Sequence, residues 1–220
     1  MADPQVIDAP SQVWRVARSD APLDMSYISP QDFRRKRAGN RFDTTSGGVL
    51  YGATDLVGCY SETLARFRPS AKVRAAVAEE PGFMVCGGVP ADWRSRRVKV
   101  CVELPDALPF LDVESDDTHE YLTTELALEL AALKVATLDV GLVRGPDRRI
   151  TRAIATWAFH AGLMDDTPRF SGIRYMSRLG NHECWAIFEG TPVIELRRDT
   201  VAVSDPDLQQ VADKFELRLF

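Results

Sequence analysis

The most constraining feature of this sequence is a run of apolar residues at helical spacing between residues 150 and 161. Their intervals of three and four residues predict one apolar helix face, which has to be buried in a core. Gly145-Pro146-Asp147 predicts a turn before this helix, and Gly162 is expected to cap its end. The residues on the apolar face are Ile150, Ala153, Ile154, Trp157, Ala158 and Ala161.

Around this helix, the sequence combines short apolar segments with a few further helical patterns. One helix is expected between Tyr51 and Pro69, with Leu56, Tyr60, Thr63 and Phe67 facing inward. Others are expected from the acidic stretch 112–120 through Leu133 and over residues 204–214. Strands are expected at residues 12–18, 49–51, 82–89, 96–104, 172–176, 184–188 and 216–220. This mixture predicts an α+β fold rather than a regular βαβ succession.

Length and charge limit the class of protein. A chain of 220 residues fits one domain, so we expect a flexible tail over residues 1–11 and a single domain over 12–220. The net charge of −5 gives no electrostatic sign of nucleic-acid binding. No segment approaches the roughly 20 apolar residues of a membrane span. We therefore expect a soluble, cytoplasmic protein that binds neither nucleic acid nor membrane.

Several functional motifs are absent from the sequence. Neither GxGxxG nor GxxxxGK[ST] occurs, which argues against a dinucleotide fingerprint and a P-loop. No HExxH motif or Cys/His cluster occurs, so no metal site is expected. The four cysteines are spread singly and are expected to be reduced core residues. His182 is interpreted as a surface residue of a loop.

Five residues remain that together suit an anionic, ribose-containing ligand. The planar fork of an arginine can hold a pyrophosphate, and an aromatic ring can stack on a base or nicotinamide. A carboxylate favours the positive charge that develops at an anomeric carbon. Singly, each residue also fits an ordinary role, such as a strand arginine that reaches solvent or a solvated helix glutamate. The five are Arg15, Arg41, Tyr51, Glu62 and Ser177.

The order and surroundings of these residues resemble the RES family, which is named for its Arg, Glu and Ser. The resemblance covers roughly residues 12–189 and is strongest in NRFDTTSGGVLYGATDLVGCYSE, residues 40–62, and in GIRYMS, which ends in Ser177. It implies a fold similar to the ADP-ribosyltransferase toxins, with a mixed sheet and surrounding helices. The helix that contains Trp157 also resembles the central helix of the family.

The resemblance also implies roles for the five residues. Arg15, Glu62 and Tyr51 are expected to be catalytic. Substrate binding is assigned to Arg41 and Ser177, with further contacts from Arg15 and Tyr51. Because Arg15 lies within an apolar segment, it is expected to be fixed by packing and to point at the reacting ribose or the adjoining phosphate. Arg41 lies between a loop-like segment and a glycine-containing turn, so it is expected to extend over the ligand from a flexible rim.

Characterised members of the family degrade NAD by phosphorolysis or hydrolysis, and at least one modifies a protein instead. Many are toxins paired with an Xre-type helix-turn-helix antitoxin. The resemblance therefore implies NAD as substrate, inorganic phosphate as a candidate co-substrate and no further cofactor. A protein-modifying mono-ADP-ribosyltransferase and an inert module that binds an antitoxin remain open, as does a homo-oligomer.

Two positions depart from the family pattern. Asn40 replaces the glycine before Arg41, and Asp43 replaces an asparagine. Asparagine tolerates a left-handed backbone better than most residues, so the turn is expected to survive. Asp43 is expected to place a negative charge near the proposed pyrophosphate site, unless Arg41 or Arg15 pairs with it.

Overall fold

The computed structural model describes residues 3–77, 86–162 and 167–220. The strands are β1 (Val6–Ile7), β2 (Val13–Arg18), β3 (Val49–Ala53), β4 (Gly88–Val89), β5 (Arg97–Glu103), β6 (Phe110–Asp112), β7 (Gly172–Met176), β8 (Glu183–Phe188), β9 (Ile194–Thr200) and β10 (Arg218–Leu219). The helices are α1 (Pro30–Phe33), α2 (Leu56–Leu64), the 3-10 turn η1 (Ala65–Phe67), α3 (Ala71–Val77), α4 (Ala91–Ser95), α5 (Asp116–Glu125), α6 (Ala127–Ala132), α7 (Val140–Val143), α8 (Arg148–His160) and α9 (Pro206–Phe215).

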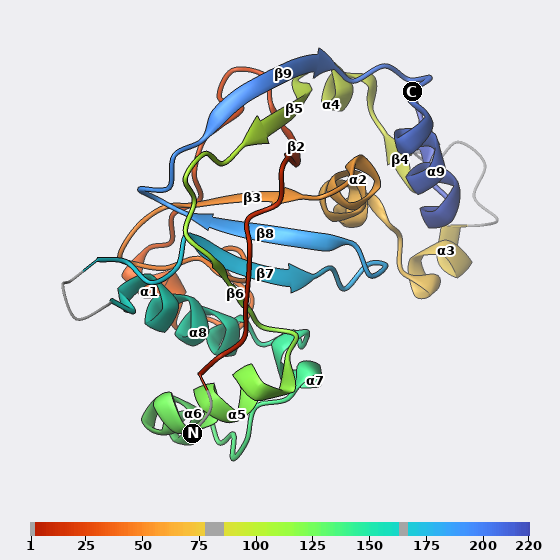
Figure 1. The fold of residues 1–220 in the computed structure, drawn as a ribbon. Helices are drawn as coiled ribbons and strands as arrows, with labels where there is room; N and C mark the ends of the chain where they lie inside the picture. Colours follow the sequence, from red (N-terminus) through yellow and green to blue (C-terminus); the bar gives the residue numbers. More distant parts are fainter. Residues whose placement is uncertain (1–2, 78–85, 163–166) are drawn as a thin grey trace.

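Eight of these strands form one mixed sheet in the order β1-β6-β7-β8-β3-β2-β5-β9 (Figure 1). Its neighbours pair antiparallel except β6 and β7, which are parallel. Strands β4 and β10 form a separate parallel pair. The predicted α+β class is confirmed, because helices surround a large mixed sheet without a repeated βαβ succession.

The sheet is weakest between β2 and β3, where Trp14 and Ala53 form the one register pair. The two backbones come close at this point, because a Cβ on Gly52 would lie 2.2 Å from Val13 Cγ1 and 2.8 Å from the Trp14 carbonyl oxygen. Glycine therefore permits this close approach. Beyond it, the two strands are not paired, and their side chains help to line the cavity described below.

Apolar clusters cover both faces of the sheet. On one face, α5, α6 and α8 pack over β3, β6, β7 and β8, and α8 contributes the predicted core residues Ile150, Ile154 and Ala158. On the other face, a second cluster joins side chains of β2, β5 and β8. A third cluster packs α2 against α4 and α9, with Tyr60 and Leu64 fully buried. Packing against α4 and α9 thus holds helix α2 in place, and with it the side chains on the face of α2 that is not packed.

Several predicted boundaries need correction. The helix that was expected to run through Leu133 is interrupted at Leu126, where α5 ends and α6 begins. In α2, Leu64 is buried, whereas Thr63 lines a cavity. The helix α8 ends at His160, and its C-cap is Ala161 rather than Gly162. Of the strand expected at residues 82–89, positions 82–85 lie outside the described residues.

The N-terminal segment and one edge strand also differ from the expectation, whereas the C-terminal elements agree with it. Val6 and Ile7 pair with Leu111 and Phe110, so the segment expected as a flexible tail contains strand β1. Strand β9 was not predicted, because it buries neither of its faces; among the described strands it pairs with β5 alone, at the edge of the sheet. The predicted C-terminal helix and last strand are present as α9 and β10.

Candidate functional site

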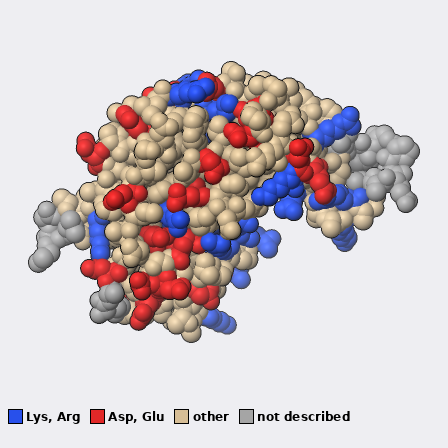
Figure 2. All heavy atoms as spheres, turned by 45° about the vertical axis from the view of Figure 1, so that its right-hand side comes forward, with Lys and Arg blue, Asp and Glu red and all other residues tan. Residues whose placement is uncertain are grey.

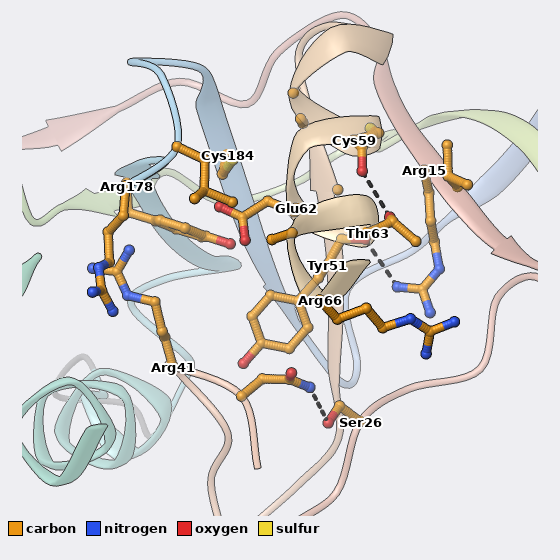
Figure 3. A pocket seen from close by; sticks show the side chains of 18 of the residues that line it. Arg15, Ser26, Arg41, Tyr51, Cys59, Glu62, Thr63, Arg66, Arg178 and Cys184 are labelled. Carbon is orange, nitrogen blue, oxygen red and sulfur yellow. Dashed lines mark hydrogen bonds between the residues drawn. The ribbon is translucent and has the colours of Figure 1, made fainter. Parts of the chain in front are cut away.

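A cavity of about 720 Å³ opens beside α2, at the place where β2 and β3 separate (Figure 3). Its walls come from distant parts of the chain: β2, β3, α2, and the strands β7 and β8. Four of the five residues selected from the sequence line it, namely Arg15, Arg41, Tyr51 and Glu62. The fifth, Ser177, contacts Glu62 directly.

The cavity is strongly cationic in a chain whose net charge is −5. Glu62 is the one acidic residue among the described residues that line it. Five arginines line it: Arg15, Arg41, Arg66, Arg148 and Arg178. On the face drawn in Figure 2, basic side chains gather at the middle and right, whereas many acidic side chains lie lower left. The five arginines around one glutamate attract an anionic ligand to the cavity.

The position of Glu62 follows from the local sequence of α2. Asp55 caps the helix by accepting a hydrogen bond from the Gly58 amide at 2.6 Å. Because Tyr60 and Leu64 are buried in the core, Glu62 lies on the opposite side and faces the cavity. The glutamate is therefore held by a helix rather than by a loop, which fixes its position more precisely.

Ser177 orients the Glu62 carboxylate. Its hydroxyl donates a hydrogen bond of 2.7 Å to Glu62 Oε1 and accepts one of 3.0 Å from the Leu179 amide. Ser177 is itself buried, and its amide donates to the His182 carbonyl. This network fixes the direction of the Glu62 carboxylate, because one of its oxygens is held by a buried hydroxyl that is itself held by the backbone.

Among the described residues that line the cavity, Arg41 has the most buried nitrogen atoms without a hydrogen-bond partner. One terminal nitrogen donates to the Val143 carbonyl at 2.6 Å, whereas Nε and the other terminal nitrogen are buried without a partner among the described residues. Its guanidinium lies 5.2 Å from the Tyr175 ring centroid. Burial lowers the pKa of Arg41, and the nearby positive charge of Arg178 adds to that effect. An anion bound here would supply the missing acceptors and relieve the repulsion.

The structure places Arg41 differently from the flexible rim that the sequence suggested. The Thr151 hydroxyl of α8 donates to the Arg41 carbonyl, and the side chain is fixed by Val143 and Tyr175. Arg41 is therefore anchored at both its backbone and its guanidinium.

Arg15 has both terminal nitrogens occupied by the protein. They donate to the carbonyls of Tyr51 and Asp24, each at 2.9 Å, and Nε is buried without a partner among the described residues. Burial also lowers the pKa of Arg15. The side chain thus bridges β2, β3 and the 19–25 loop across the gap in the sheet. Its first effect is to hold the cavity wall in place.

The charge of Asp43 does not face the cavity. Asp43 is fully buried and accepts hydrogen bonds from the Tyr51 hydroxyl at 2.9 Å and the Asn40 amide at 2.6 Å. Neither Arg41 nor Arg15 pairs with it. Burial and the neighbouring Asp43 charge raise the pKa of Tyr51 well above its usual value, so its hydroxyl remains a donor. The Asp43 carboxylate therefore does not line the cavity, and its oxygens accept bonds from Tyr51 and Asn40 instead.

Two further expectations from the sequence need correction. The left-handed residue of the turn is Gly39, with φ of +60°, so Asn40 does not need that conformation. His182 is not a free surface residue, because its side chain is 16% exposed and its Nδ1 lies 3.3 Å from Asp55 Oδ1. A Cβ on Gly58 would clash with His182, so the histidine packs directly on the first turn of α2.

Sequence reasoning missed most of the arginines in the cavity. Arg66 follows Glu62 by four residues, so the helical spacing could have placed both on one face. Arg178 directly follows Ser177, which was a weaker signal. Arg148 lies at the start of α8, and nothing in its local sequence indicated that it would reach the cavity.

Two cysteines line the cavity but do not make it a thiol-dependent site. Burial raises the pKa of Cys59 to about 12 and raises that of Cys184 further. Both therefore remain neutral thiols near pH 7, and the thiolate is the nucleophilic form. All four cysteines are free, with Cys59, Cys101 and Cys184 buried. The described residues contain no group of three or more His, Cys, Asp or Glu placed to hold a metal ion.

The fold and the cavity define an α+β protein with one oriented glutamate inside a ring of arginines. Residues 12–209 match the RES domain family, which is most of the chain. The chain therefore belongs to the RES domain family. The curated proteins contain no match to it. Within the described residues, no helix combines the length and apolarity that crossing a membrane requires.

Proposed function

We propose that this protein cleaves NAD at the bond between nicotinamide and ribose and transfers ADP-ribose to phosphate or water. The observation that carries the proposal is the Glu62 carboxylate, oriented by Ser177 in a cavity otherwise charged by five arginines. RES domains are known from NAD-related toxin–antitoxin systems, which supports NAD as the ligand. The cavity volume of about 720 Å³ lies within the range of small-molecule sites.

The residues around Glu62 suit the pyrophosphate of NAD and one of its planar rings. Arg41 and Arg178 lie on one side of Glu62, whereas Arg15 and Arg66 lie on the other (Figure 3). The unpaired nitrogens of Arg41, with Arg178 nearby, provide the donors that a pyrophosphate needs. Tyr51 lies between these sides and offers a ring for stacking on a planar group.

Glu62 would act on the ribose. When the glycosidic bond breaks, its electron pair leaves with the nicotinamide nitrogen and neutralises the pyridinium charge. Positive charge then develops on the ribose anomeric carbon, and a fixed carboxylate stabilises it. An oxygen of phosphate or water forms the new bond and loses its proton to solvent. The orienting bond from Ser177 keeps the carboxylate in place during this change.

The test compares two glutamine variants for nicotinamide release from NAD. Glu62→Gln keeps the shape and can still accept the Ser177 hydrogen bond, but it removes the charge. We expect a rate lower by about 10²–10³, as for other electrostatic groups of this kind. Glu120→Gln, at an exposed site on α5, is the charge-matched control and should retain the wild-type rate. Wild-type turnover in a folded Glu62→Gln protein would refute the assignment.

The acceptor is decided by the same assay run with and without inorganic phosphate. Phosphorolysis gives a phosphate-dependent rate and a phosphorylated ADP-ribose product, whereas hydrolysis gives free ADP-ribose in both cases. Transfer of labelled ADP-ribose to a protein band would instead indicate a protein-modifying enzyme. No nicotinamide release under any condition would indicate a binding module.

An Xre-type antitoxin is part of the proposal, because RES domains are associated with such partners. The partner would be sought in the neighbouring reading frame as a small helix-turn-helix protein. Co-expression should yield a complex that co-purifies and releases nicotinamide more slowly than the free enzyme. Separate elution of the two proteins would remove the partner from the proposal.

A further inference from the structure

A second cavity, of about 510 Å³, shares one residue with the first. That residue is Arg66, which lines both cavities. The second cavity lies among η1, α4 and the start of β5, and the proposed NAD chemistry does not use it. Its lining is Arg18, Arg66, Phe67, Pro90, Asp92, Trp93, Arg96 and Arg97.

Aromatic rings hold two of the four arginines in this second cavity. The Arg97 guanidinium lies 4.9 Å from the Trp93 ring centroid, and that of Arg66 lies 4.8 Å from the Phe67 ring centroid. The two rings meet edge to face at 6.2 Å. These contacts fix the direction of both guanidinium groups before any ligand arrives, which lowers the entropic cost of binding.

The positive charge of the second cavity is only partly compensated. Asp92 is its one acidic residue within the described chain and lies 3.6 Å from Arg96. Arg18 pairs with the exposed Asp20. Arg66 and Arg97 have no carboxylate partner within 4 Å among the described residues. Burial lowers the pKa of Arg97, and repulsion from Arg66 and Arg18 lowers it further.

The second cavity also has a buried hydrogen-bond donor in its wall. Trp93 is 3% exposed, and its indole Nε1 has no hydrogen-bond acceptor among the described residues. A buried N–H without an acceptor costs free energy. Arg97 has one long hydrogen bond, from a terminal nitrogen to the Trp93 carbonyl at 3.4 Å. Together with Arg66, which has no carboxylate partner within 4 Å among the described residues, these groups make a set of donors in need of acceptor oxygens.

We propose that this second cavity binds a phosphate-type oxyanion at a site separate from the catalytic pocket. The phosphate group, rather than a base, is the recognised part, because Arg97 already covers the face of the Trp93 ring. The anion is either free, as in pyrophosphate, or carried by a nucleotide. Because Arg66 faces both cavities, an occupant of one alters the charge that the other presents.

The experiment titrates inorganic pyrophosphate into the full-length protein by isothermal calorimetry. We expect two equivalents on the wild type, one in each cavity. Arg97→Gln should weaken the second-cavity equivalent by about tenfold or more, the usual loss for one charge-assisted contact. Arg41→Gln should remove the other equivalent. Arg34→Gln, at an exposed arginine outside both cavities, is the charge-matched control and should retain both.

The outcomes separate this proposal from the proposed NAD chemistry. A single equivalent that Arg97→Gln weakens and Arg41→Gln retains supports the second cavity alone. Pyrophosphate binding that Arg97→Gln leaves unchanged overturns the proposal. If Arg97→Gln does not fold, as judged by circular dichroism, Arg96→Gln replaces it with the same expectation. Repeating the titration with ADP shows the source, since a carried phosphate would give tighter second-cavity binding than pyrophosphate.

Discussion

Replacement by lysine should affect Arg15 and Arg41 differently. At Arg15 it should mainly lower stability, and at Arg41 it should mainly weaken NAD binding. In Arg15→Lys, one ammonium group replaces a fork that reaches the Tyr51 and Asp24 carbonyls at once. Lysine can satisfy one of these carbonyls but not both. In Arg41→Lys, the single bond to the Val143 carbonyl can be retained, whereas the two buried nitrogens that have no partner among the described residues are altered or lost.

The expected magnitudes follow from these contacts. Losing one charge-assisted hydrogen bond and leaving a carbonyl unsatisfied should lower the free energy of unfolding of Arg15→Lys by about 2–4 kcal/mol. For a chain of this size, that corresponds to roughly 5–15 °C in melting temperature. Arg41→Lys should cost less than about 1 kcal/mol in stability but raise the KM for NAD by about ten- to a hundredfold.

Thermal unfolding and steady-state nicotinamide release measure the two effects on the same preparations. The relevant comparison is the difference between the variants, since both keep the positive charge. A melting temperature of Arg15→Lys within about 2 °C of wild type would refute the bridging role. A larger loss of stability in Arg41→Lys than in Arg15→Lys would refute the whole division of labour.

Three further perturbations follow from the structure. Ser177→Ala removes the donor that orients Glu62 and should lower kcat by about tenfold at similar KM; a change in KM alone would contradict this. Asp205 caps α9 and contacts Lys99 Nζ at 2.5 Å, so Asp205→Asn should cost about 1–3 kcal/mol at pH 7 in urea unfolding. Burial alone would raise the pKa of Asp205, but the hydrogen bonds from Lys99 and the backbone outweigh it and the pKa is lowered. This stabilisation is present above the unfolded pKa of about 3.9 and is lost as the pH falls through the folded value, so wild type and variant should converge in acid. Reducing agent should leave the melting temperature unchanged, because all four cysteines are free, and a drop of several degrees would contradict this.

The sequence alone determined those helices and strands whose buried residues recur at a regular spacing along one segment. The apolar period of residues 150–161 predicted α8, and strands β2, β5, β7 and β8 appeared as short apolar runs between turn residues. The capping residue Asp205 and Pro206 marked the start of α9. The family motif also selected five residues that the fold brings to one site, although they lie up to 162 positions apart from Arg15 to Ser177.

Only the tertiary structure decided where those side chains make their bonds. Arg15 and Arg41 cannot be told apart from their residue type, yet Arg15 donates to two carbonyls, whereas Arg41 has two nitrogens without a partner in the described part of the chain. The sequence predicted that the charge of Asp43 would repel an anion in the cavity, but the structure shows its carboxylate buried and bonded to the Tyr51 hydroxyl. Strand β9 escaped prediction because an edge strand without a buried face leaves no apolar period. The physical reason is common to all three. Periodicity reports burial along one segment, whereas hydrogen-bond partners and strand neighbours depend on segments far away in the chain.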